Sequence, residues 1–544
     1  MIMGESWVIW WAIWAVFVSG YGSLVVDGVA WNGTVYVVGD SAAGTTDKDF
    51  ICATLDWWPQ TKCDSKTQNC PWANASLLNL DLISHPTLSN AIKAFSPLRI
   101  RLGGTLQDKV IYQTSVNETC KPFQSDRAQL FEFTKGCLPL SRWDELNDFF
   151  KRSRAAIIFG LNALYGRHVN LDGSTTGDWN STNAEFLIRY SAHRKYPIIA
   201  WEFGNELVGK SAIGAKISAD QYANDTIRFH HIIQKIYCSS RYKPLIIAPG
   251  GFYDAHWFEE YLSKTSDTLD VITQHIYNLG EGSSKNVIGK ILETVANSSA
   301  NNDFIPLHEL LKNYNPSRRH KVVAWVGESG GAYNSGAPNA SNAFVNSFWY
   351  LDQLGTSARY DTKTYCRQTL IGGNYGLLDA TTFLPNPDYY SALLWHKLMG
   401  PKSLTTAFVG TNSGVIRGYI HCSKTNNPNT NGGVTMLLMN LDSGTNVTID
   451  TLSLKCVGKN RRGACPWPAG YGNPTANYTR EEYHLKPAQA GDLSSRTVRL
   501  NGRELSGVPD RLDPVTVPSV HNITVAPYSI VFVRLPDLRL PACN

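Results

Sequence analysis

Two glutamates of the chain stand in settings that suit paired carboxylate chemistry. Glu206 closes the segment Trp201-Glu202-Phe203-Gly204-Asn205-Glu206, and Glu328 closes the apolar run that begins at Val322. Both runs are typical of a fully buried parallel strand that ends in small and polar residues. A carboxylate at the exit of such a strand faces the ligand-binding end of an α/β barrel. Two carboxylates brought together there would supply the acid and the nucleophile that cleave a glycosidic bond.

Glu206 has the features of the general acid. Burial and a nearby second carboxylate would raise its pKa, as an acid requires. Asn205, directly before it, could reach the 2-hydroxyl group of a sugar, a contact that strengthens in the transition state. A loop carboxylate that caps the next helix is the structural alternative. Glu202 competes as the acid, but its place inside the run is more typical of a structural ion pair.

Glu328 has the features of the nucleophile. Gly327 and the small residues Ser329, Gly330 and Gly331 keep bulk away from an approaching anomeric carbon. A purely structural glutamate is again the alternative. Positions 206 and 328 fit the ends of the fourth and seventh strands of a barrel. A retaining enzyme would hold the two carboxyl groups about 5–5.5 Å apart.

Weaker signals follow other predicted strands. Tyr277 could donate a hydrogen bond to Glu328, while His275 could equally be a satisfied core histidine. Asp56 and the Gly103-Gly104-Thr105 segment end the first two strands, where turn chemistry is the alternative. The basic run 318–321 precedes the seventh strand, at the opposite end of the barrel, and is interpreted as a solvated face.

A barrel is the fold that would position these residues. Short apolar runs alternate with amphipathic stretches from about residue 50 to 385, and no Gly-x-Gly-x-x-Gly motif follows the first run. Eight such repeats predict an α/β fold, a (β/α)8 TIM barrel, rather than an open doubly wound sheet. The expected strands are 50–54, 98–102, 156–161, 198–203, 245–248, 271–275, 322–326 and 369–371, and expected helices include 143–152, 183–193, 219–237 and 342–354.

The pattern changes after residue 400. Alternating, strand-like segments lie at 414–421, 434–441, 446–454, 496–500 and 523–535, separated by Gly, Pro and Asn turns. They predict an all-β module, most simply a C-terminal β-sandwich, and the segment 25–38 resembles a strand pair that joins it. We therefore predict a signal peptide at 1–22, a catalytic barrel at 46–390, and a sandwich made of 23–45 plus 391–544. No flexible linker separates the two bodies, which should pack as one unit.

Several features point to secretion. Trp7 to Val18 form an apolar stretch with the length of a signal h-region, and an uncleaved anchor is the alternative because a positive n-region is missing. No later stretch has the length and apolar character of a membrane helix. Acceptor Asn-x-Ser/Thr sites for glycosylation begin at Asn32, Asn74, Asn117, Asn180, Asn224, Asn297, Asn339, Asn446, Asn477 and Asn522.

Eleven cysteines lack the CxxC spacing of a metal site, so disulfides are the better interpretation. Disulfides between Cys63 and Cys70 and between Cys456 and Cys465 could close short loops. Cys422 could form a third disulfide with Cys543. An odd count leaves at least one thiol out of these pairs.

Composition narrows the function further. The 544 residues are 43% hydrophobic and 17% charged, with a net charge of +5. The chain can therefore bury a large core and more than one domain. The mild positive charge permits an acidic substrate, and no basic aromatic module suggests nucleic acid. We expect a monomer with no metal and no cofactor.

Taken together, the motifs resemble the heparanase family of retaining glycoside hydrolases, and specifically its heparanase-like, β-glucuronidase branch of plants. The resemblance covers nearly the whole mature chain and includes the C-terminal Cys543. The matching stretches are Ala53–Asp56, Leu98–Thr105, Phe159–Leu164, Trp201–Glu206, His275–Tyr277, Gly327–Ser329, Arg367–Gln368, Gly373–Tyr375 and His421–Cys422.

This resemblance implies a (β/α)8 barrel with a β-sandwich that acts on β-linked glucuronides with retention. Glu206 would be the acid/base and Glu328 the nucleophile. The carboxylate of the uronic acid would be held by Tyr375 and by backbone N–H groups of the loop 333–336, since preorganised neutral donors bind carboxylates well. The implied substrate-binding residues are Asp56, Thr105, Asn205, His275, Tyr277, Asn334, Ser335, Gln368 and Tyr375.

Two departures from animal heparanase shape the expected substrate. Asn334 and Ser335 stand where the animal enzyme has consecutive glycines. The stretch 123–143 is short and carries few basic residues, whereas the animal enzyme has a long excised linker and basic sulfate-binding clusters. Glucuronic acid on a plant glycan such as arabinogalactan, or a flavone glucuronide, therefore fits better than heparan sulfate.

Two alternative functions stay open. One is a retaining hydrolase of the same clan that acts on a neutral sugar, and the other is a catalytically silent carbohydrate-binding matrix protein. The expected location is outside the cell, in a matrix or cell wall, with a vacuole or lysosome-type compartment and peripheral membrane association as alternatives.

Overall fold

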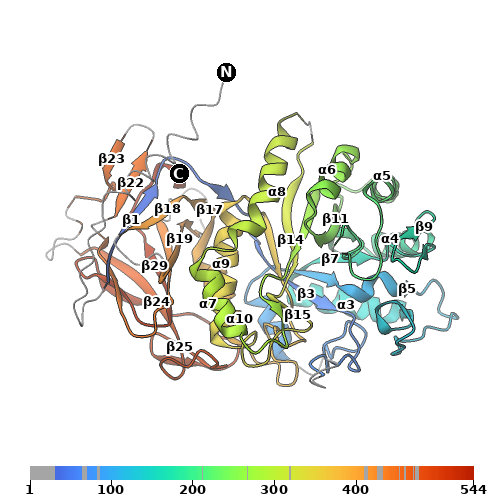
Figure 1. The fold of residues 1–544 in the computed structure, drawn as a ribbon, viewed down its shortest axis with the longest axis horizontal. Coiled ribbons are helices and arrows are strands. Elements are labelled where there is room, and N and C mark those ends of the chain that lie inside the picture. Colours follow the sequence, from blue (N-terminus) through green and yellow to red (C-terminus); the bar gives the residue numbers. More distant parts are fainter. Residues whose placement is uncertain are drawn as a thin grey trace.

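The computed structural model shows two bodies side by side, a barrel and a sheet-rich C-terminal body (Figure 1). The described residues are 31–63, 70–82, 86–210, 212–265, 267–317, 320–409, 414–425, 433–451, 454–458, 461–469, 471 and 477–544. The predicted signal peptide at 1–22 therefore lies outside the described residues. Among the described helices, none has both the length and the apolar character that crossing a membrane requires.

Eight parallel strands close into a barrel, which confirms the predicted fold class. Most of them are short apolar runs buried on both faces, as strands surrounded by helices must be. In chain order the strands are β3 (Ile51–Asp56), β4 (Leu98–Gly103), β7 (Ala155–Leu161), β10 (Ile198–Phe203), β11 (Leu245–Phe252), β12 (Val271–Ile276), β14 (Val323–Ser329) and β16 (Thr364–Arg367).

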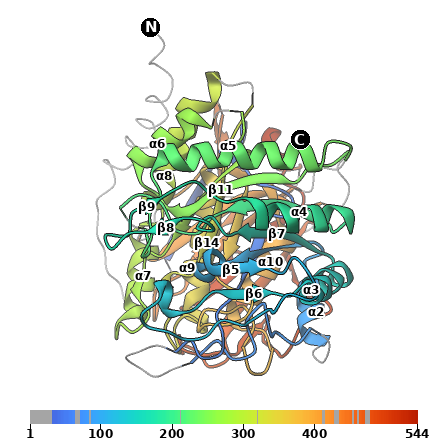
Figure 2. The same cartoon turned by 90° about the vertical axis from the view of Figure 1, so that its right-hand side faces the viewer.

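Helices surround this barrel on its outside. They are α2 (Pro86–Lys93), α3 (Leu140–Ser153), α4 (Thr182–His193), α5 (Ala219–Ile236), α6 (Ala255–Lys264), α7 (Val287–Ala296), α8 (Asn301–Tyr314), α9 (Phe344–Arg359) and α10 (Pro387–Leu398). Figure 2 shows α3, α4 and α5 covering the side of the barrel that faces away from the C-terminal body.

The predicted position of the eighth strand, 369–371, was wrong. The strand is β16, five residues earlier, where Tyr365 pairs with Ile51 and Cys366 with Cys52 of the first strand. A disulfide joins Cys52 to Cys366 inside the barrel, next to the buried Trp325. The run at 369–371 is more apolar, but register with the first strand, which lies over 300 residues away in the chain, decides where the barrel closes.

The C-terminal body consists of two sheets with a shared apolar core. One sheet contains β1 (Trp31–Val38), β18 (Thr406–Val409), β21 (Val447–Ile449), β22 (Lys455–Gly458), β23 (Arg461–Ala464) and β28 (Ile523–Val525). The other contains β2 (Gly44–Thr45), β17 (Met399–Leu404), β19 (Ile416–Ser423), β20 (Val434–Asn440), β24 (Thr479–Pro487), β25 (Val498–Leu500), β26 (Arg503–Leu505), β27 (Val515–Pro518) and β29 (Ser529–Leu535).

This body differs from prediction in two details. The expected single segment 523–535 is two strands, β28 and β29, which lie in different sheets. The expected strand pair at 25–38 appears as one strand, β1, and residues 25–30 lie outside the described residues. In the described chain, three two-stranded sheets lie in the segments between barrel strands. They are β5 (Val110–Tyr112) with β6 (Gly136–Leu138), β8 (His168–Val169) with β9 (Thr175–Thr176), and β13 (Gly280–Glu281) with β15 (Ala332–Tyr333).

The structure contains the expected disulfides and places the predicted acceptor asparagines at the surface. The three expected cysteine pairs are present, and Cys120–Cys137 and Cys52–Cys366 are added to them. Cys238 is exposed and forms no disulfide. All ten predicted acceptor asparagines are exposed, so a glycan at any of them would extend into solvent.

Candidate active site

The turn that carries Glu206 follows β10, the fourth barrel strand. Glu206 adopts a left-handed backbone conformation with a φ of 54°, which costs a non-glycine residue roughly 1–2 kcal/mol. Its N–H donates to the carbonyl of Gly250 at 2.6 Å. Burial raises the pKa of Glu206 to about 7, against a smaller opposing effect of the Arg101 charge. Glu206 is therefore protonated at acidic pH, as a general acid must be.

His275, near the end of β12, fixes one side of the Glu206 carboxyl group. Its Nδ1 lies 2.9 Å from Glu206 Oε1. Burial lowers the pKa of His275 to about 4, so the ring is neutral near pH 7 and the contact is a hydrogen bond rather than an ion pair. Within the described part of the chain, His275 Nε2 has no hydrogen-bond partner. The contact occupies one Glu206 oxygen and leaves the second to face a ligand.

Arg101 on β4 connects the surroundings of the two glutamates. Its buried guanidinium donates to Glu202 Oε2 at 2.5 Å and to Glu328 Oε2 at 2.8 Å. It also donates to Asn205 Oδ1 at 2.8 Å. Because a guanidinium only donates, the Asn205 atom that faces it must be oxygen. Asn205 Nδ2 is thereby left as a buried donor with no partner among the described residues, and Glu202 forms the structural pair that its position suggested.

Glu328 lies in β14, the seventh barrel strand, between two donors. Arg101 holds Oε2, and the Tyr277 hydroxyl donates to Oε1 at 2.6 Å. Across the pair β12–β14, His275 is in register with Glu328, after an irregularity between Gln274 and His275. Such irregularities re-aim side chains, and here they bring a histidine of one strand beside a glutamate of the next.

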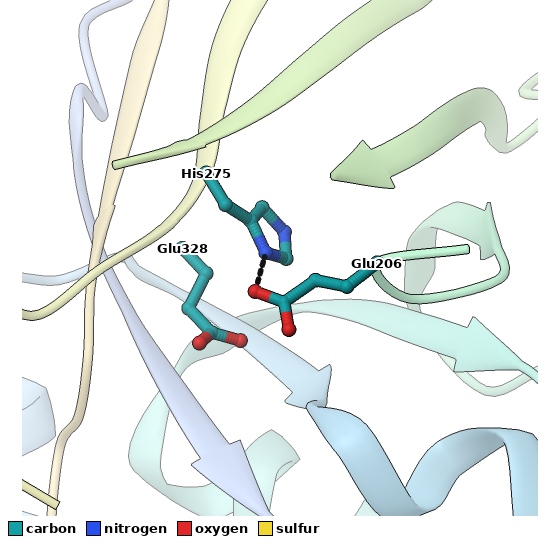
Figure 3. Close-up of side chains that lie close together, drawn as sticks. All are labelled: Glu206, His275 and Glu328. Carbon is teal, nitrogen blue, oxygen red and sulfur yellow. Dashed lines mark hydrogen bonds and ion pairs between the residues drawn. The ribbon is translucent and has the colours of Figure 1, made fainter. Parts of the chain in front are cut away.

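The two glutamates and His275 face one small space (Figure 3). One oxygen of each glutamate and one ring nitrogen of His275 all lie within 4.8 Å of one another. That spacing suits the about 5–5.5 Å of a retaining glycosidase and is shorter than the about 6.5–9.5 Å of an inverting one. The same atoms could ligate a cation, but the Arg101 guanidinium 2.8 Å from Glu328 opposes a second positive charge there.

Three of the expected substrate-binding residues form one hydrogen-bonded group. Gln368 Nε2 donates to Asp56 Oδ2 at 2.8 Å and lies 3.5 Å from the Tyr375 hydroxyl. The Thr54 hydroxyl in turn donates to the side-chain oxygen Oε1 of Gln368. Burial, followed by the nearby Glu328 charge, raises the pKa of Asp56 well above its ordinary value. A protonated Asp56 would donate to a sugar hydroxyl and would not repel an anionic substrate.

The loop expected to hold the uronate carboxylate follows β15. Asn334, Ser335 and Gly336 have φ angles of 57°, 70° and 74°, and no partner is found among the described residues for their backbone N–H groups. Ser335 Oγ accepts from Trp72 Nε1 at 2.9 Å. A Cβ added to Gly336 would lie 2.7 Å from Tyr375 Cδ1, so the loop packs directly on the Tyr375 ring. These backbone N–H groups, which have no partner among the described residues, therefore lie beside Tyr375, the side chain expected to bind the uronate carboxylate.

Other predicted residues are less closely connected. The Asn334 side chain reaches Glu281 at 3.4 Å in an exposed position. Thr105 is partly exposed at the start of a 3-10 helix, and no hydrogen bond links its side chain to the other site residues in the described chain. In the basic run 318–321, His320 pairs with Asp270 at 3.2 Å at the far end of the barrel, and residues 318 and 319 lie outside the described residues.

Sequence reasoning missed the role of Arg101. A signal was present, because Leu98-Arg99-Ile100-Arg101-Leu102 alternates arginine with apolar residues, and alternate residues of a strand share one face. In a closed barrel that face is the interior. Arg99 meets Asp47 at 2.7 Å at one end of the interior, and Arg101 meets the glutamates at the other.

The sequence of the chain was compared with those of known proteins and protein families. Residues 32–355 match the profile described as "Glycosyl hydrolase family 79, N-terminal domain". Heparanase-like protein 3 of Arabidopsis thaliana is 50% identical over 95% of this chain and 96% of its own length. Baicalin-beta-D-glucuronidase of Scutellaria baicalensis is 43% identical over 92% of both chains. Heparanase of Rattus norvegicus is 29% identical over 85% of this chain and 88% of its own.

Solved structures support the fold alone. A 4-O-alpha-L-rhamnosyl-beta-D-glucuronidase from Fusarium oxysporum superposes with a TM-score of 0.61 at 14% identity, over 92% of this chain and 100% of that one. A GH51 arabinofuranosidase from Xanthomonas axonopodis pv. citri gives 0.60 at 15% identity, over 93% and 99%. Since the family profile spans more than half of the chain and a half-identical relative aligns over nearly all of it, the chain belongs to glycosyl hydrolase family 79 and is a heparanase-like glycosidase.

Proposed function

We propose that the protein is a secreted retaining β-glucuronidase that releases β-linked glucuronic acid from glycans or small glucuronides. The observation that carries the proposal is the buried pair Glu206 and Glu328, with oxygens within 4.8 Å and unlike partners. Glu206 lies beside a neutral imidazole, whereas Glu328 lies beside a guanidinium and a phenol. Environments that separate two carboxyl groups in this way assign one as acid and the other as nucleophile.

In the first step, Glu328 attacks the anomeric carbon while Glu206 gives its proton to the glycosidic oxygen, so that the aglycone leaves as a neutral alcohol. Arg101 and Tyr277 hold the two Glu328 oxygens and fix the direction of attack. The free Asn205 Nδ2 donor is directed to the 2-hydroxyl group of the sugar, where hydrogen bonds strengthen in the transition state.

In the second step, Glu206 acts as the base. Having lost its proton to the leaving group, it accepts one from a water molecule, and the water oxygen attacks the anomeric carbon of the glycosyl-enzyme. Glu328 is released as a carboxylate. Two inversions at one carbon give a product with the β configuration of the substrate.

The glucuronide preference is supported by the group around Tyr375. The free N–H donors of Ser335 and Gly336 and the Tyr375 hydroxyl offer neutral hydrogen bonds to a carboxylate. Asp56 and Gln368 provide hydrogen bonds for the ring hydroxyls. The name of the Scutellaria baicalensis relative, baicalin-beta-D-glucuronidase, agrees with this preference.

Secretion is proposed from separate features. Five disulfides and ten exposed acceptor asparagines suit an oxidising compartment. The cell wall or extracellular matrix is the proposed location, and a monomer is the proposed state.

A comparison of chromogenic substrates tests the activity. The purified enzyme should hydrolyse 4-nitrophenyl β-glucuronide at least about 100-fold more efficiently than the matching glucoside and xyloside, since a site built to bind a polar group rejects an analogue that lacks it. NMR of the first product should show the β anomer. Faster cleavage of the glucoside or xyloside would assign the enzyme to neutral sugars, and an α product would exclude double displacement.

Two single variants test whether Glu328 is required for hydrolysis. Glu328→Gln should abolish turnover of every glycoside, while Glu202→Gln should leave measurable activity because Glu202 pairs with Arg101 and is not part of the cluster of Glu206, His275 and Glu328. Activity of purified Glu328→Gln equal to that of the wild type would remove Glu328 from the mechanism.

A further inference from the structure

A buried carboxyl group lies behind the turn that carries Glu206. Asp108 is 3% exposed and belongs to the 3-10 helix Thr105–Lys109 after β4. Its Oδ2 accepts from the backbone N–H of Asn205 at 2.8 Å, and its Oδ1 accepts from the backbone N–H of Ala163 at 2.7 Å. One side chain therefore connects the ends of two neighbouring barrel strands, β7 and β10, at the residue that precedes Glu206.

Keeping a carboxyl group in this place is unfavourable in itself. Burial raises the pKa of Asp108 to about 8, which shows how poorly the surroundings solvate its charge. An apolar side chain would fill the same volume without that cost. Two backbone N–H groups, however, need two acceptor oxygens, and only a carboxyl group offers them at this spacing.

The turn that Asp108 holds is also strained. Glu206 has a left-handed φ of 54°, and its backbone is fixed by Gly250 and Ile213, which bond its N–H at 2.6 Å and its C=O at 3.1 Å. The first contact comes from β11, and the second comes from the loop that follows Glu206 in the chain. Asp108 holds it from the other side, through Asn205. Without that third support the residue has freedom to relax toward an ordinary backbone conformation and to carry its carboxyl group away from the reaction space.

We infer that Asp108 is a positioning residue for the acid/base Glu206: it fixes the Asn205-Glu206 turn so that the Glu206 carboxyl group meets the glycosidic oxygen. The inference rests on the proposed function of Glu206. Asp108 itself touches neither the substrate nor the reacting atoms. Its effect is therefore confined to proton transfer, to and from Glu206, and to the Asn205 contact with the 2-hydroxyl group.

The leaving group of the substrate isolates this role. A 4-nitrophenolate departs with little protonation, whereas a simple alcohol such as methanol departs only when an acid protonates its oxygen, and such general acid catalysis contributes about 10²–10⁴-fold. Asp108→Asn places an amide donor against one of the two N–H groups, so one bond is lost at nearly constant volume. We expect kcat/KM for methyl β-glucuronide to fall at least about ten-fold more than kcat/KM for 4-nitrophenyl β-glucuronide.

The ratio of the two rate constants does not depend on how much of a preparation is folded. Asp108→Ser, which is smaller and presents no amide donor, provides a second variant if Asp108→Asn yields no folded protein. Asp270→Asn is the matched control. Asp270 also accepts a backbone N–H between neighbouring strands, from Ile246 at 2.7 Å, but at the opposite end of the barrel. Its variant should leave the ratio unchanged.

The outcomes separate the inference from the proposed function. If the wild-type enzyme cleaves no glucuronide, the proposed function fails and Glu206 has no acid role to support. If the wild type is active and both Asp108 variants lower the two rate constants by the same factor, or leave the ratio at the Asp270→Asn value, Asp108 does not position Glu206 and the inference is overturned. A selective loss on the methyl glycoside supports it.

Discussion

Glu206 has a neutral histidine as its direct hydrogen-bond partner, whereas Glu328 accepts hydrogen bonds from a guanidinium and a phenol. The contrast arises because β12 contributes a neutral histidine toward one carboxyl group and β4 contributes an arginine toward the other. In the proposed mechanism, acid and nucleophile therefore differ only in their neighbours, since both residues are glutamates buried to a similar degree.

The pH dependence of the enzyme should report Glu206. Its pKa is raised to about 7 by burial, so the protonated form required for the first step is present below that value and is lost as the pH rises through it. We expect kcat/KM for a glucuronide with a poor leaving group to fall above about pH 7. A pH–rate profile measures this. In Glu206→Gln the basic limb should disappear, and a wild-type rate that persists unchanged into alkaline buffer would contradict the assignment.

Arg101 should be the residue whose loss affects both stability and rate. Removing it leaves Glu202 and Glu328 buried without their cation, and breaking such a buried pair costs about 3–5 kcal/mol. We expect Arg101→Gln to lower the free energy of unfolding by that amount in urea denaturation. Adding Glu202→Gln should restore part of the loss, because one uncompensated charge is then removed. Strictly additive losses in the double variant would mean that the two side chains are not coupled.

Residue roles were predictable from the chain only where the residue type is itself distinctive. The Asn205-Glu206 pair and the glycines around Glu328 are local signals, because the residue types and their order along the chain are enough to indicate the chemistry. Asp108 gave no such signal, and the alternation around Arg101 indicated only which face of the strand it occupies. Their partners come from strands about 50 to 230 residues away, and only barrel closure shows which groups meet.

At the scale of elements, long apolar runs were easy to locate and short ones were not. Strand β10 carries Ile198-Ile199-Ala200-Trp201 and was predicted at its observed position, 198–203. Strand β16 has four residues, Thr364–Arg367, of which two are strongly polar. Its position follows from pairing with β3, which is a tertiary property that no local window contains.

The disulfide between the first and last barrel strands should stabilise this closure. Cys52 and Cys366 are separated by 314 residues, so the chain-entropy estimate of their contribution exceeds about 4.7 kcal/mol, against roughly 2–3 kcal/mol for a short loop. We expect Cys52→Ala/Cys366→Ala to lower the free energy of unfolding more than Cys63→Ala/Cys70→Ala, whose cysteines are 7 residues apart. Chemical denaturation of both variants provides the comparison. Equal losses would show that loop length does not govern the effect here.

The loop after β15 should determine recognition of the uronate rather than the rate of bond cleavage. In Gly336→Ala the new methyl group meets the Tyr375 ring at 2.7 Å, and the residue must also hold a φ of 74°. We expect the KM for glucuronides to rise about ten-fold or more, with a smaller change for a glucoside, because the displaced donors serve only the carboxylate. Steady-state kinetics on both substrates separate these effects. An equal loss on both sugars would place the loop outside carboxylate recognition.

At the scale of the molecule, the acceptor asparagines lie in both bodies and all are exposed. Expression through a secretory pathway should therefore give a glycoprotein whose mass falls on treatment with a peptide N-glycosidase. Activity should survive gentle deglycosylation, since no acceptor asparagine is among the residues that surround Glu206 and Glu328. A secreted chain with the unmodified mass would contradict the expectation.

The sandwich has a core of its own between its two sheets, but the face that meets the barrel shares the barrel's apolar core through residues such as Tyr419 and Leu437. Helix α9 is buried on all sides from Phe344 to Ala358, as a helix enclosed between two bodies must be. Its first N–H groups bond to Ser495 and Leu493 of the C-terminal body, and its buried Asp352 pairs with Arg417 of β19 at 2.7 Å. In Figure 1, α9 stands between the two bodies.

A substitution at this boundary should consequently disturb the active site as well as the sandwich. A Cβ at Gly355 would lie 2.3 Å from the Tyr419 ring of β19, so Gly355→Val forces the two bodies apart at a cost of about 1–3 kcal/mol or more. We expect one thermal transition, shifted to lower temperature, with the native tryptophan fluorescence and the glycosidase activity lost together. Gly444→Val, where an added Cβ meets nothing within 4 Å, should leave the transition in place. If Gly355→Val instead produced two transitions, with activity following only the unshifted one, the barrel would be stable without its partner and the shared core would not couple them.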